Sequence, residues 1–257
     1  MGPVGKLSRA LHFGKRREEH SPDPSAESVD ALDPRDQIIV ERCLPYSMTG
    51  PARLTAVVDA VRHVGRAGVA GALVECGVWR GGSVLAMILA LQELGVEDRD
   101  LYLFDTFEGM TEPTAHDVSR FDRPALETWE KSGGRPWEEA FGPEVLNEDG
   151  VRATLADTGY PTSRIRLVKG RVEDTIPAAA PQSIALLRLD TDWYESTRHE
   201  LEHLYPRLTP NGVLIIDDYG HWDGARRAVD EYFEQHGPRP FLSRVDYTGR
   251  LAVKPGV

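Results

Sequence analysis

Two apolar segments of this chain end in acidic side chains. The run IALLRLD ends in Asp190 and is followed closely by Asp192, and the run VLIIDD ends in Asp217 and Asp218. Short apolar runs rich in leucine and β-branched residues are typical of buried strands. Because one helical segment separates the two runs, we expect neighbouring parallel strands whose carboxyl ends meet. The four carboxylates would then lie in one crevice.

A crevice lined by ionised carboxylates needs protons or a cation. Two like charges about 4 Å apart repel by roughly 4 kcal/mol at the effective dielectric of a protein surface. Ligands that are all oxygen select a hard dication, Mg²⁺ or alternatively Ca²⁺ or Mn²⁺, and no cluster of Cys or His has zinc spacing. Asp192 and the Asp217–Asp218 pair could instead cap the helices that follow. Capping does not explain why carboxylates converge from two strands, so the pattern favours a metal site.

A glycine-rich loop follows an earlier predicted strand. The strand ALVEC, which contains Glu75, leads into GVWRGGS (77–83), and the next predicted strand ends in Asp105. Glycines let the backbone approach a ligand closely, and a carboxylate at the second strand end can bind ribose hydroxyls. A tight turn and a helix cap are the alternative interpretations, but the two features together favour a nucleoside. The motif GxxxxGKS is absent, which argues against hydrolysis of a nucleoside triphosphate.

Strands and helices alternate along the chain. Helical spacing is found at 51–67, 84–94, 148–159, in a segment carrying Leu201, Leu204 and Leu208 that TPNG closes, and at 224–235. Strands are expected at 72–76, 100–105, 164–170, 184–190 and 213–218, with a C-terminal hairpin at FLSRVDY, TG and RLAVKP. This order predicts a Rossmann-like α/β fold. It would have a seven-stranded, mostly parallel sheet with an antiparallel C-terminal hairpin strand and helices on both faces.

The chain length and the distribution of polar residues predict the domain organisation. We expect one domain at 34–257, preceded by a flexible arm or lid at 1–33, which is polar and lacks a sustained period. An irregular insertion at about 107–148 is long enough to be a loop on the substrate side of the site.

Charge and cysteine content restrict the partners and the compartment. A net charge of −11 argues against binding to nucleic acid, which needs clustered Lys and Arg. No run approaches the ~18 apolar residues that span a membrane, and the N-terminus has no apolar core of signal-peptide length. Two cysteines, Cys43 and Cys76, without such a signal indicate reduced thiols and a cytoplasmic protein.

Several segments together resemble class I S-adenosylmethionine-dependent methyltransferases of the macrocin O-methyltransferase-like group, which modify sugars of natural products. The resemblance runs from about residue 46 to the C-terminus and is weakest across 111–160. The segments that carry it are SMTGPARL (47–54), LVECGVWRGGSV (73–84), LFDTFEGM (103–110), LLRLDTDWYEST (186–197) and GVLIIDDYGHWDGARRAVDEYF (212–233).

The resemblance implies a cofactor site, a metal site and a missing base. S-adenosylmethionine would lie over the glycine loop. Mg²⁺ would be bound by Asp190, Asp217 and Asp218. Asp218 stands where the related catechol methyltransferases carry an Asn ligand, and Trp193 stands where they carry a Lys base. The implied cofactor residues are Met48, Thr49, Glu75, Gly77, Arg80, Ser83, Asp105, Thr106, Gly170, Val172 and Asp190.

A carboxylate can replace the absent Lys as general base. We expect Asp190 or Asp192 to accept the proton, with His221 as a further candidate. The alternative for His221 is that of an exposed loop residue.

The function expected from the resemblance is metal-assisted methylation of a deoxysugar hydroxyl in secondary metabolism. The acceptor would be a TDP-sugar, such as TDP-rhamnose at its 3′-oxygen, or a sugar already attached to an aglycone. The partners would be these small molecules and further copies of the chain in a homo-oligomer, with no nucleic acid and no membrane. The alternatives are a catechol or phenol O-methyltransferase, a dinucleotide-binding oxidoreductase and a non-catalytic nucleotide-binding module.

Overall fold

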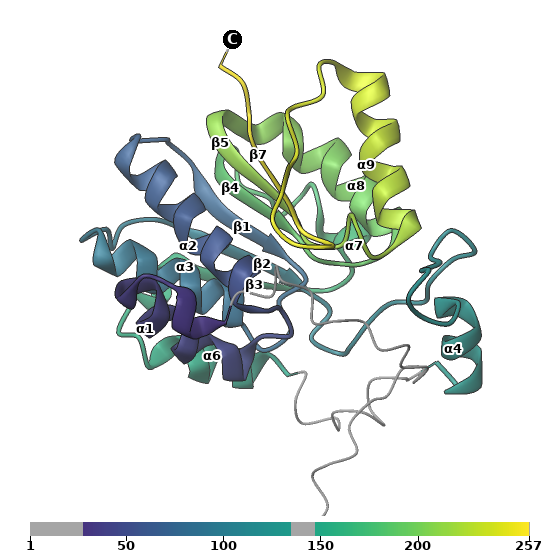
Figure 1. The fold of residues 1–257 in the computed structure, drawn as a ribbon, viewed down its shortest axis with the longest axis horizontal. Helices are drawn as coiled ribbons and strands as arrows, with labels where there is room; N and C mark the ends of the chain where they lie inside the picture. Colours follow the sequence, from purple (N-terminus) through teal and green to yellow (C-terminus); the bar gives the residue numbers. More distant parts are fainter. Residues whose placement is uncertain (1–27, 135–146, 257) are drawn as a thin grey trace, which may run out of the picture.

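The computed structural model describes residues 28–134 and 147–256. Its centre is a seven-stranded sheet in the order β3-β2-β1-β4-β5-β7-β6 (Figure 1). β7 runs antiparallel to β5 and β6, and the other adjacent pairs of strands are parallel. The predicted fold class is therefore confirmed. The strands are β1 (Ala72–Cys76), β2 (Leu101–Asp105), β3 (Ile165–Lys169), β4 (Ile184–Leu189), β5 (Leu208–Ile216), β6 (Ser243–Arg244) and β7 (Arg250–Val253).

Helices cover both faces of the sheet (Figure 1). On one face lie α1 (Pro34–Cys43), α2 (Pro51–Arg66), α3 (Gly82–Glu93) and α6 (Glu148–Ala156). On the other lie α7 (Val172–Thr175), α8 (Tyr194–Leu204) and α9 (Asp223–His236). The helix α4 (Ala125–Lys131) stands apart from the sheet. Short 3-10 turns occur at Val29–Ala31, Leu44–Tyr46, Thr162–Arg164 and Tyr205–Arg207.

The strands position the site because both of their faces are buried. In β1, Leu73 packs into the cluster formed with α2 and α3, and its neighbour Val74 packs into the cluster formed with α8 and α9. Successive side chains of a strand point to opposite faces, so a continuous apolar run fills two cores at once. Polar groups are therefore expected mainly where the strands end.

Two predicted boundaries were wrong around β5. The helix α8 ends at Leu204 because Pro206 cannot continue it. Leu208 was expected on that helix but begins β5, and the TPNG segment is a bulge within the strand and not a helix end. Asn211 has a φ of 63° there, a left-handed conformation that Asn tolerates.

The C-terminal hairpin is shorter than predicted. The strand expected across FLSRVDY is reduced to Ser243–Arg244. The Asp246 side chain accepts hydrogen bonds from the backbone N–H groups of Thr248 and Gly249, at 2.9 and 2.6 Å, which turns the chain early.

The sequence did not predict α1 or α4. α1 begins at Pro34, where Asp33 caps it, and α4 lies inside the expected insertion. The expected arm at 1–33 lies outside the described residues except for 28–33, and residues 135–146 of the insertion are also outside them. None of the helices in the described ranges has the length and apolarity needed to cross a membrane.

Candidate active site

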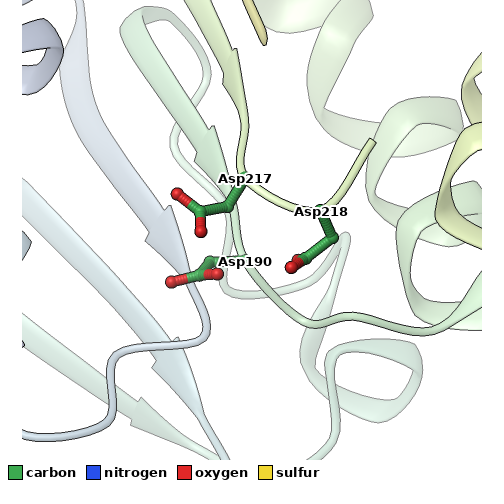
Figure 2. Close-up of side chains that lie close together, drawn as sticks. All are labelled: Asp190, Asp217 and Asp218. Carbon is green, nitrogen blue, oxygen red and sulfur yellow. The ribbon is translucent and has the colours of Figure 1, made fainter. Parts of the chain in front are cut away.

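The carboxyl ends of β4 and β5 meet, as the sequence predicted. Leu189 pairs with Ile216 in parallel register. The residues that follow are Asp190, Asp217 and Asp218, and each offers a carboxylate oxygen that lies within 4.8 Å of the others (Figure 2). Three acidic groups from two strands therefore face one point.

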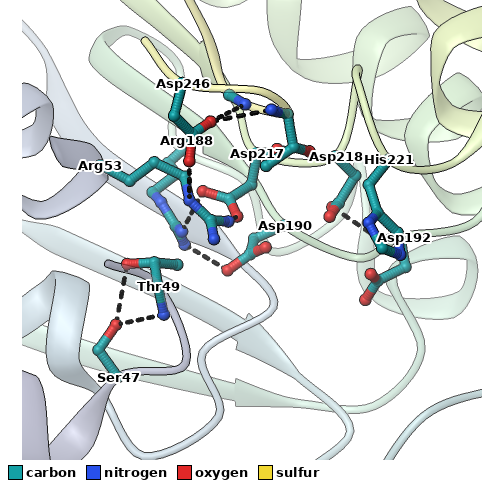
Figure 3. A network of polar contacts seen from close by, with 12 residues as sticks. Ser47, Thr49, Arg53, Arg188, Asp190, Asp192, Asp217, Asp218, His221 and Asp246 are labelled. Carbon is teal, nitrogen blue, oxygen red and sulfur yellow. Dashed lines mark hydrogen bonds and ion pairs between the residues drawn. The ribbon is translucent and has the colours of Figure 1, made fainter. Parts of the chain in front are cut away.

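A buried guanidinium compensates part of this charge. Arg188 Nη1 lies 2.5 Å from Glu75 Oε1 and 2.6 Å from Asp190 Oδ2, and its Nη2 lies 2.6 Å from Asp217 Oδ1. Arg53 of α2 binds the other oxygen of Asp217, and its Nε lies 3.1 Å from Asp246 Oδ2 (Figure 3). The expectation that only protons or a metal balance the cluster was therefore incomplete.

The signal for Arg188 was present in the sequence. A charged residue at the fifth position of the apolar run IALLRLD must be buried with partners. Arg53 carried no comparable signal, because its position on an amphipathic helix is compatible with solvent exposure.

Negative charge still exceeds positive charge at this end of the sheet. Burial raises the pKa of Asp190 and of Asp218 well above their usual range, although Arg188 opposes the shift in both. Burial also acts on Asp217, but the Arg188 and Arg53 guanidiniums hold its pKa below its usual value. The cluster thus favours a proton or an added cation beside Asp190 and Asp218.

Asp192 lies at the centre of a tight turn that follows β4. Its φ is 67°, and Trp193 N–H donates to the Thr191 carbonyl at 2.8 Å, which closes a three-residue γ-turn. The Trp222 indole N–H donates to Asp192 Oδ1 at 2.8 Å, and the Asp192 N–H donates to Asp218 Oδ2 at 3.2 Å. Burial, followed by the nearby Asp190 charge, raises the pKa of Asp192 to about 7.

His221 is more enclosed than an exposed loop residue. Its side chain is 19% exposed, and its Nε2 lies 2.8 Å from Asp122 Oδ2. Its Nδ1 lies 3.1 Å from the Tyr247 hydroxyl, and the Phe121 ring stacks on it with 5.6 Å between centroids. Burial lowers the pKa of His221, and Asp122 partly offsets this effect. Sequence reasoning did not include Phe121, Asp122 or Tyr247, which only the loop geometry brings to His221.

The glycine loop packs directly on the end of β4. Gly77 has a φ of 81°, and a Cβ added there would lie 1.9 Å from the Asp190 carbonyl oxygen. The Asp105 carboxylate accepts hydrogen bonds from Val78 N–H at 2.6 Å and Trp79 N–H at 3.1 Å. Asp105 therefore holds the loop in shape, a role that the sequence did not predict for it.

A cavity of about 400 Å³ connects the glycine loop with the carboxylate cluster. Two of the expected cofactor residues, Glu75 and Arg80, are outside its lining. Glu75 is buried beside Arg188, and its Oε2 has no hydrogen-bond partner within residues 28–134 and 147–256; Arg80 donates to the Pro45 carbonyl at 3.2 Å. The expected site residues that do line it are Met48, Thr49, Gly77, Ser83, Asp105, Thr106, Gly170, Val172, Asp190, Asp192, Asp217, Asp218 and His221.

Comparison with solved structures defines the class of this fold. The O-methyltransferase NovP superimposes with a TM-score of 0.69 at 29% identity, covering 82% of this chain and 83% of NovP. The calicheamicin methyltransferase CalS11 superimposes with a TM-score of 0.64 at 21% identity over 98% of both chains, which bears on the fold alone. The sheet, the glycine loop and these neighbours define a class I methyltransferase.

Sequence comparison identifies the family. The macrocin O-methyltransferase (TylF) model matches residues 8–253. The 8-demethyl-8-(2,3-dimethoxy-alpha-L-rhamnosyl)-tetracenomycin-C 4′-O-methyltransferase of Streptomyces olivaceus is 38% identical over 206 residues, which are 79% of this chain and 74% of that protein. The mycinamicin III 3″-O-methyltransferase of Micromonospora griseorubida is 32% identical over 204 residues, 79% of this chain and 76% of that protein. The chain belongs to the macrocin O-methyltransferase family, and the resemblance noted in its sequence is confirmed.

Proposed function

We propose that this O-methyltransferase transfers a methyl group from S-adenosylmethionine to a sugar hydroxyl of a glycosylated natural product or its sugar precursor, with help from a divalent metal. The observation that carries the metal-assisted part is the meeting of Asp190, Asp217 and Asp218 within 4.8 Å at the cavity wall. The names of the two curated relatives support the sugar acceptor.

The residues around the glycine loop fit the charged end of S-adenosylmethionine. Gly81 precedes α3 without a side-chain cap, so the first N–H groups of this helix remain available to a carboxylate. Glu75 Oε2 has no hydrogen-bond partner among the described residues, and this acceptor suits an ammonium group, although Glu75 lies outside the cavity lining. Thr49 and Ser83 line the cavity and add hydroxyl groups.

The three aspartates fit a hard dication. Carboxylate oxygens are the ligands that Mg²⁺ prefers. Burial, together with the neighbouring carboxylates, raises the pKa of Asp190 and of Asp218, and a dication would offset this effect. When bound, the ion would lower the pKa of a sugar hydroxyl and hold two vicinal hydroxyls in place. A metal ion at this position would compete with Arg53, which already binds Asp217.

Asp192 is the best general base in this site. Its pKa of about 7 matches a group that must accept a proton near neutral pH. Its Oδ1 accepts the Trp222 indole N–H, which fixes the direction of the carboxylate. Asp190 is less suited to this role because Arg188 and the proposed metal both occupy it.

An aromatic wall of Phe121, His221 and Tyr247 fits the acceptor sugar; His221 and Tyr247 line the cavity, and Phe121 stacks on His221 outside the lining. Phe121 and Tyr247 are 48% and 39% exposed and flank His221, with 5.4 Å between their ring centroids. Aromatic faces bind the apolar face of a pyranose ring through its C–H groups. The Asp122–His221 pair adds polar groups for sugar hydroxyls at the same wall.

The geometry disfavours a catechol or phenol methyltransferase. Trp193, at the position of the Lys base in those enzymes, is 6% exposed and donates its indole N–H to the Thr111 carbonyl at 3.0 Å. It cannot accept a proton from a phenol.

A methyl-transfer assay tests the proposal. The chain is incubated with S-adenosylmethionine, Mg²⁺ and a panel of TDP-deoxysugars, rhamnosylated aglycones and catechols, and products are read by mass spectrometry. We expect a gain of one methyl on a sugar, and loss of activity with EDTA that Mg²⁺ restores. Methylation of catechols alone would contradict the acceptor, and undiminished activity in EDTA would contradict the metal. The homo-oligomer stays a prediction, for which light scattering gives the mass.

A further inference from the structure

A buried acid that the proposed mechanism does not use lies beneath the site. Glu200 on α8 is 0% exposed, and its Oε1 accepts a hydrogen bond from the Thr191 hydroxyl at 3.0 Å. Its neighbours on the buried face of α8 are Leu201 and Leu204. A carboxyl in such surroundings costs stability relative to an apolar side chain of similar size, so its hydrogen bond to the loop above requires an explanation.

We propose that Glu200 is a positioning residue that acts through Thr191 on the γ-turn carrying Asp192. The inference rests on the proposed function, because it assumes that Asp192 accepts the proton. Glu200 lies outside the cavity lining and outside the Asp190–Asp217–Asp218 cluster, whereas Thr191, whose hydroxyl it binds, lines the cavity.

The turn needs support because its backbone is strained. A γ-turn centred on a non-glycine residue with positive φ is strained and persists only where the surroundings enforce it, and Asp192 has a φ of 67°. From the cavity side, Asp192 N–H is held by Asp218 and its carboxylate by Trp222. From the core side, the Thr191 hydroxyl is held by Glu200. The turn is thus anchored on both sides.

The register of the turn is also fixed along the chain. Gly77 lies so close to the Asp190 carbonyl that no side chain fits between them. The Ser196 hydroxyl donates to the Trp193 carbonyl at 3.1 Å, which fixes the residue after the turn. Between these two points, two side chains of α8 reach Thr191: Glu200 Oε1 accepts from its hydroxyl at 3.0 Å, and the Ser196 hydroxyl donates to its carbonyl at 3.4 Å. The Glu200 bond is the shorter of the two, and its removal loosens the backbone that directs Asp192.

A neutral carboxyl is enough for this role. Burial raises the pKa of Glu200 well above its usual range, and a glutamine amide has the shape of the neutral acid and can accept the same hydrogen bond. Leucine fills similar space and accepts none. The Glu200→Gln and Glu200→Leu variants therefore separate the hydrogen bond from the packing.

The first experiment compares turnover with stability. For Glu200→Leu we expect kcat to fall roughly 10- to 100-fold, with KM for S-adenosylmethionine and for the acceptor unchanged and Tm equal or higher. Glu200→Gln should keep turnover within about threefold of the parent. Thr191→Val, which leaves the buried Glu200 unchanged, should lower kcat by a similar factor. Thr191→Ser keeps the hydroxyl and should keep kcat near that of the parent. The matched control is Glu202→Leu, an exposed position on the same helix that should change nothing.

The second experiment needs no substrate. The Trp222 indole N–H binds Asp192, so its ¹H–¹⁵N resonance reports the direction of that carboxylate. We expect this resonance, assigned with Trp222→Phe, to shift in Glu200→Leu and Thr191→Val and to stay in place in Glu200→Gln.

The outcomes separate this inference from the proposed function. Three results would overturn the positioning role. The first is parent turnover in both Glu200→Leu and Thr191→Val, and the second is an equal loss of turnover in Glu200→Gln and Glu200→Leu. The third is a Trp222 resonance that does not move in Glu200→Leu. If the parent chain methylates no acceptor, the proposed function fails, and the Trp222 resonance alone still decides whether Glu200 positions Asp192.

Discussion

Arg188 and Asp217 form an ion pair between adjacent strand ends, with 2.6 Å between Nη2 and Oδ1 and both side chains 2% exposed. Arg188 also reaches Glu75 and Asp190, so one guanidinium holds together the ends of β1, β4 and β5. Removing this charge would leave Glu75 and Asp190 without their ion-pair partner and Asp217 with Arg53 alone.

The first prediction concerns this guanidinium. Arg188→Met should lower the free energy of unfolding by about 3–5 kcal/mol, because Glu75 and Asp190 lose their buried counter-charge and Asp217 keeps only Arg53. Arg188→Lys should recover part of the loss, since a Lys ammonium keeps the charge but lacks the planar fork. Urea denaturation measures both, and Arg198→Met, at an exposed position on α8, is the control. A stable Arg188→Met protein would contradict the structural role.

The second prediction concerns competition between Arg53 and a metal. Asp217 uses one oxygen for Arg188 and the other for Arg53, so a dication bound there must share an oxygen with a guanidinium. Arg53→Gln should tighten Mn²⁺ binding on the order of 10-fold by removing that positive charge. Isothermal titration measures the affinity, and Arg66→Gln on the same helix should leave it unchanged. Weaker binding in Arg53→Gln would mean that Arg53 supports the ion.

The third prediction concerns the metal ligands themselves. Asp218→Ala should abolish detectable Mn²⁺ binding, because it removes one of three carboxylates that face the same point. Adenosylhomocysteine binding should persist, since β4 separates the end of β5, where Asp218 lies, from the glycine loop that follows β1. Electron paramagnetic resonance of bound Mn²⁺ and calorimetry of adenosylhomocysteine measure the two effects. Equal metal affinity in the variant and the parent would exclude Asp218 as a ligand.

The fourth prediction concerns the base. Asp192→Asn keeps the shape of the side chain but cannot take a proton, so kcat should fall roughly 10²- to 10⁴-fold. KM values should change little because the hydrogen bond from Trp222 can remain. Steady-state kinetics at saturating Mg²⁺ measure the split, with Asp223→Asn at the exposed start of α9 as control. Near-parent turnover would return Asp190 and His221 to consideration.

The fifth prediction concerns the acceptor wall. Phe121→Ala should raise KM for the sugar acceptor roughly 10-fold by removing an aromatic face, while adenosylhomocysteine affinity stays the same. Phe121 is 48% exposed, so stability should be unaffected. Phe241→Ala, at a position 88% exposed in the segment after α9, is the matched control. A change in cofactor affinity without a change in acceptor KM would mean that Phe121 contacts the other ligand.

The sequence by itself determined the sheet, the helices on its faces and the meeting of two acidic strand ends. These features follow from local patterns, because continuous apolar runs must be buried on both faces and polar groups then gather where the runs stop. Asp190, Asp217 and Asp218 could be placed together from strand order alone. The β5 bulge and the short hairpin were missed, because side-chain bonds such as those of Asp246 override strand propensity.

Only the tertiary structure decided how the charge of the site is balanced. Arg53 and Asp217 are 164 residues apart in the chain, and Arg188 and Glu75 are 113 apart. Neither pairing follows from the spacing of residues along the chain, because each depends on how α2 and β1 pack against β4 and β5. The same holds for Glu200 beneath Thr191 and for Asp122 beside His221. The hydrophobic pattern depends on residues close together in the chain, whereas the partner of a buried charge depends on how distant segments pack against each other.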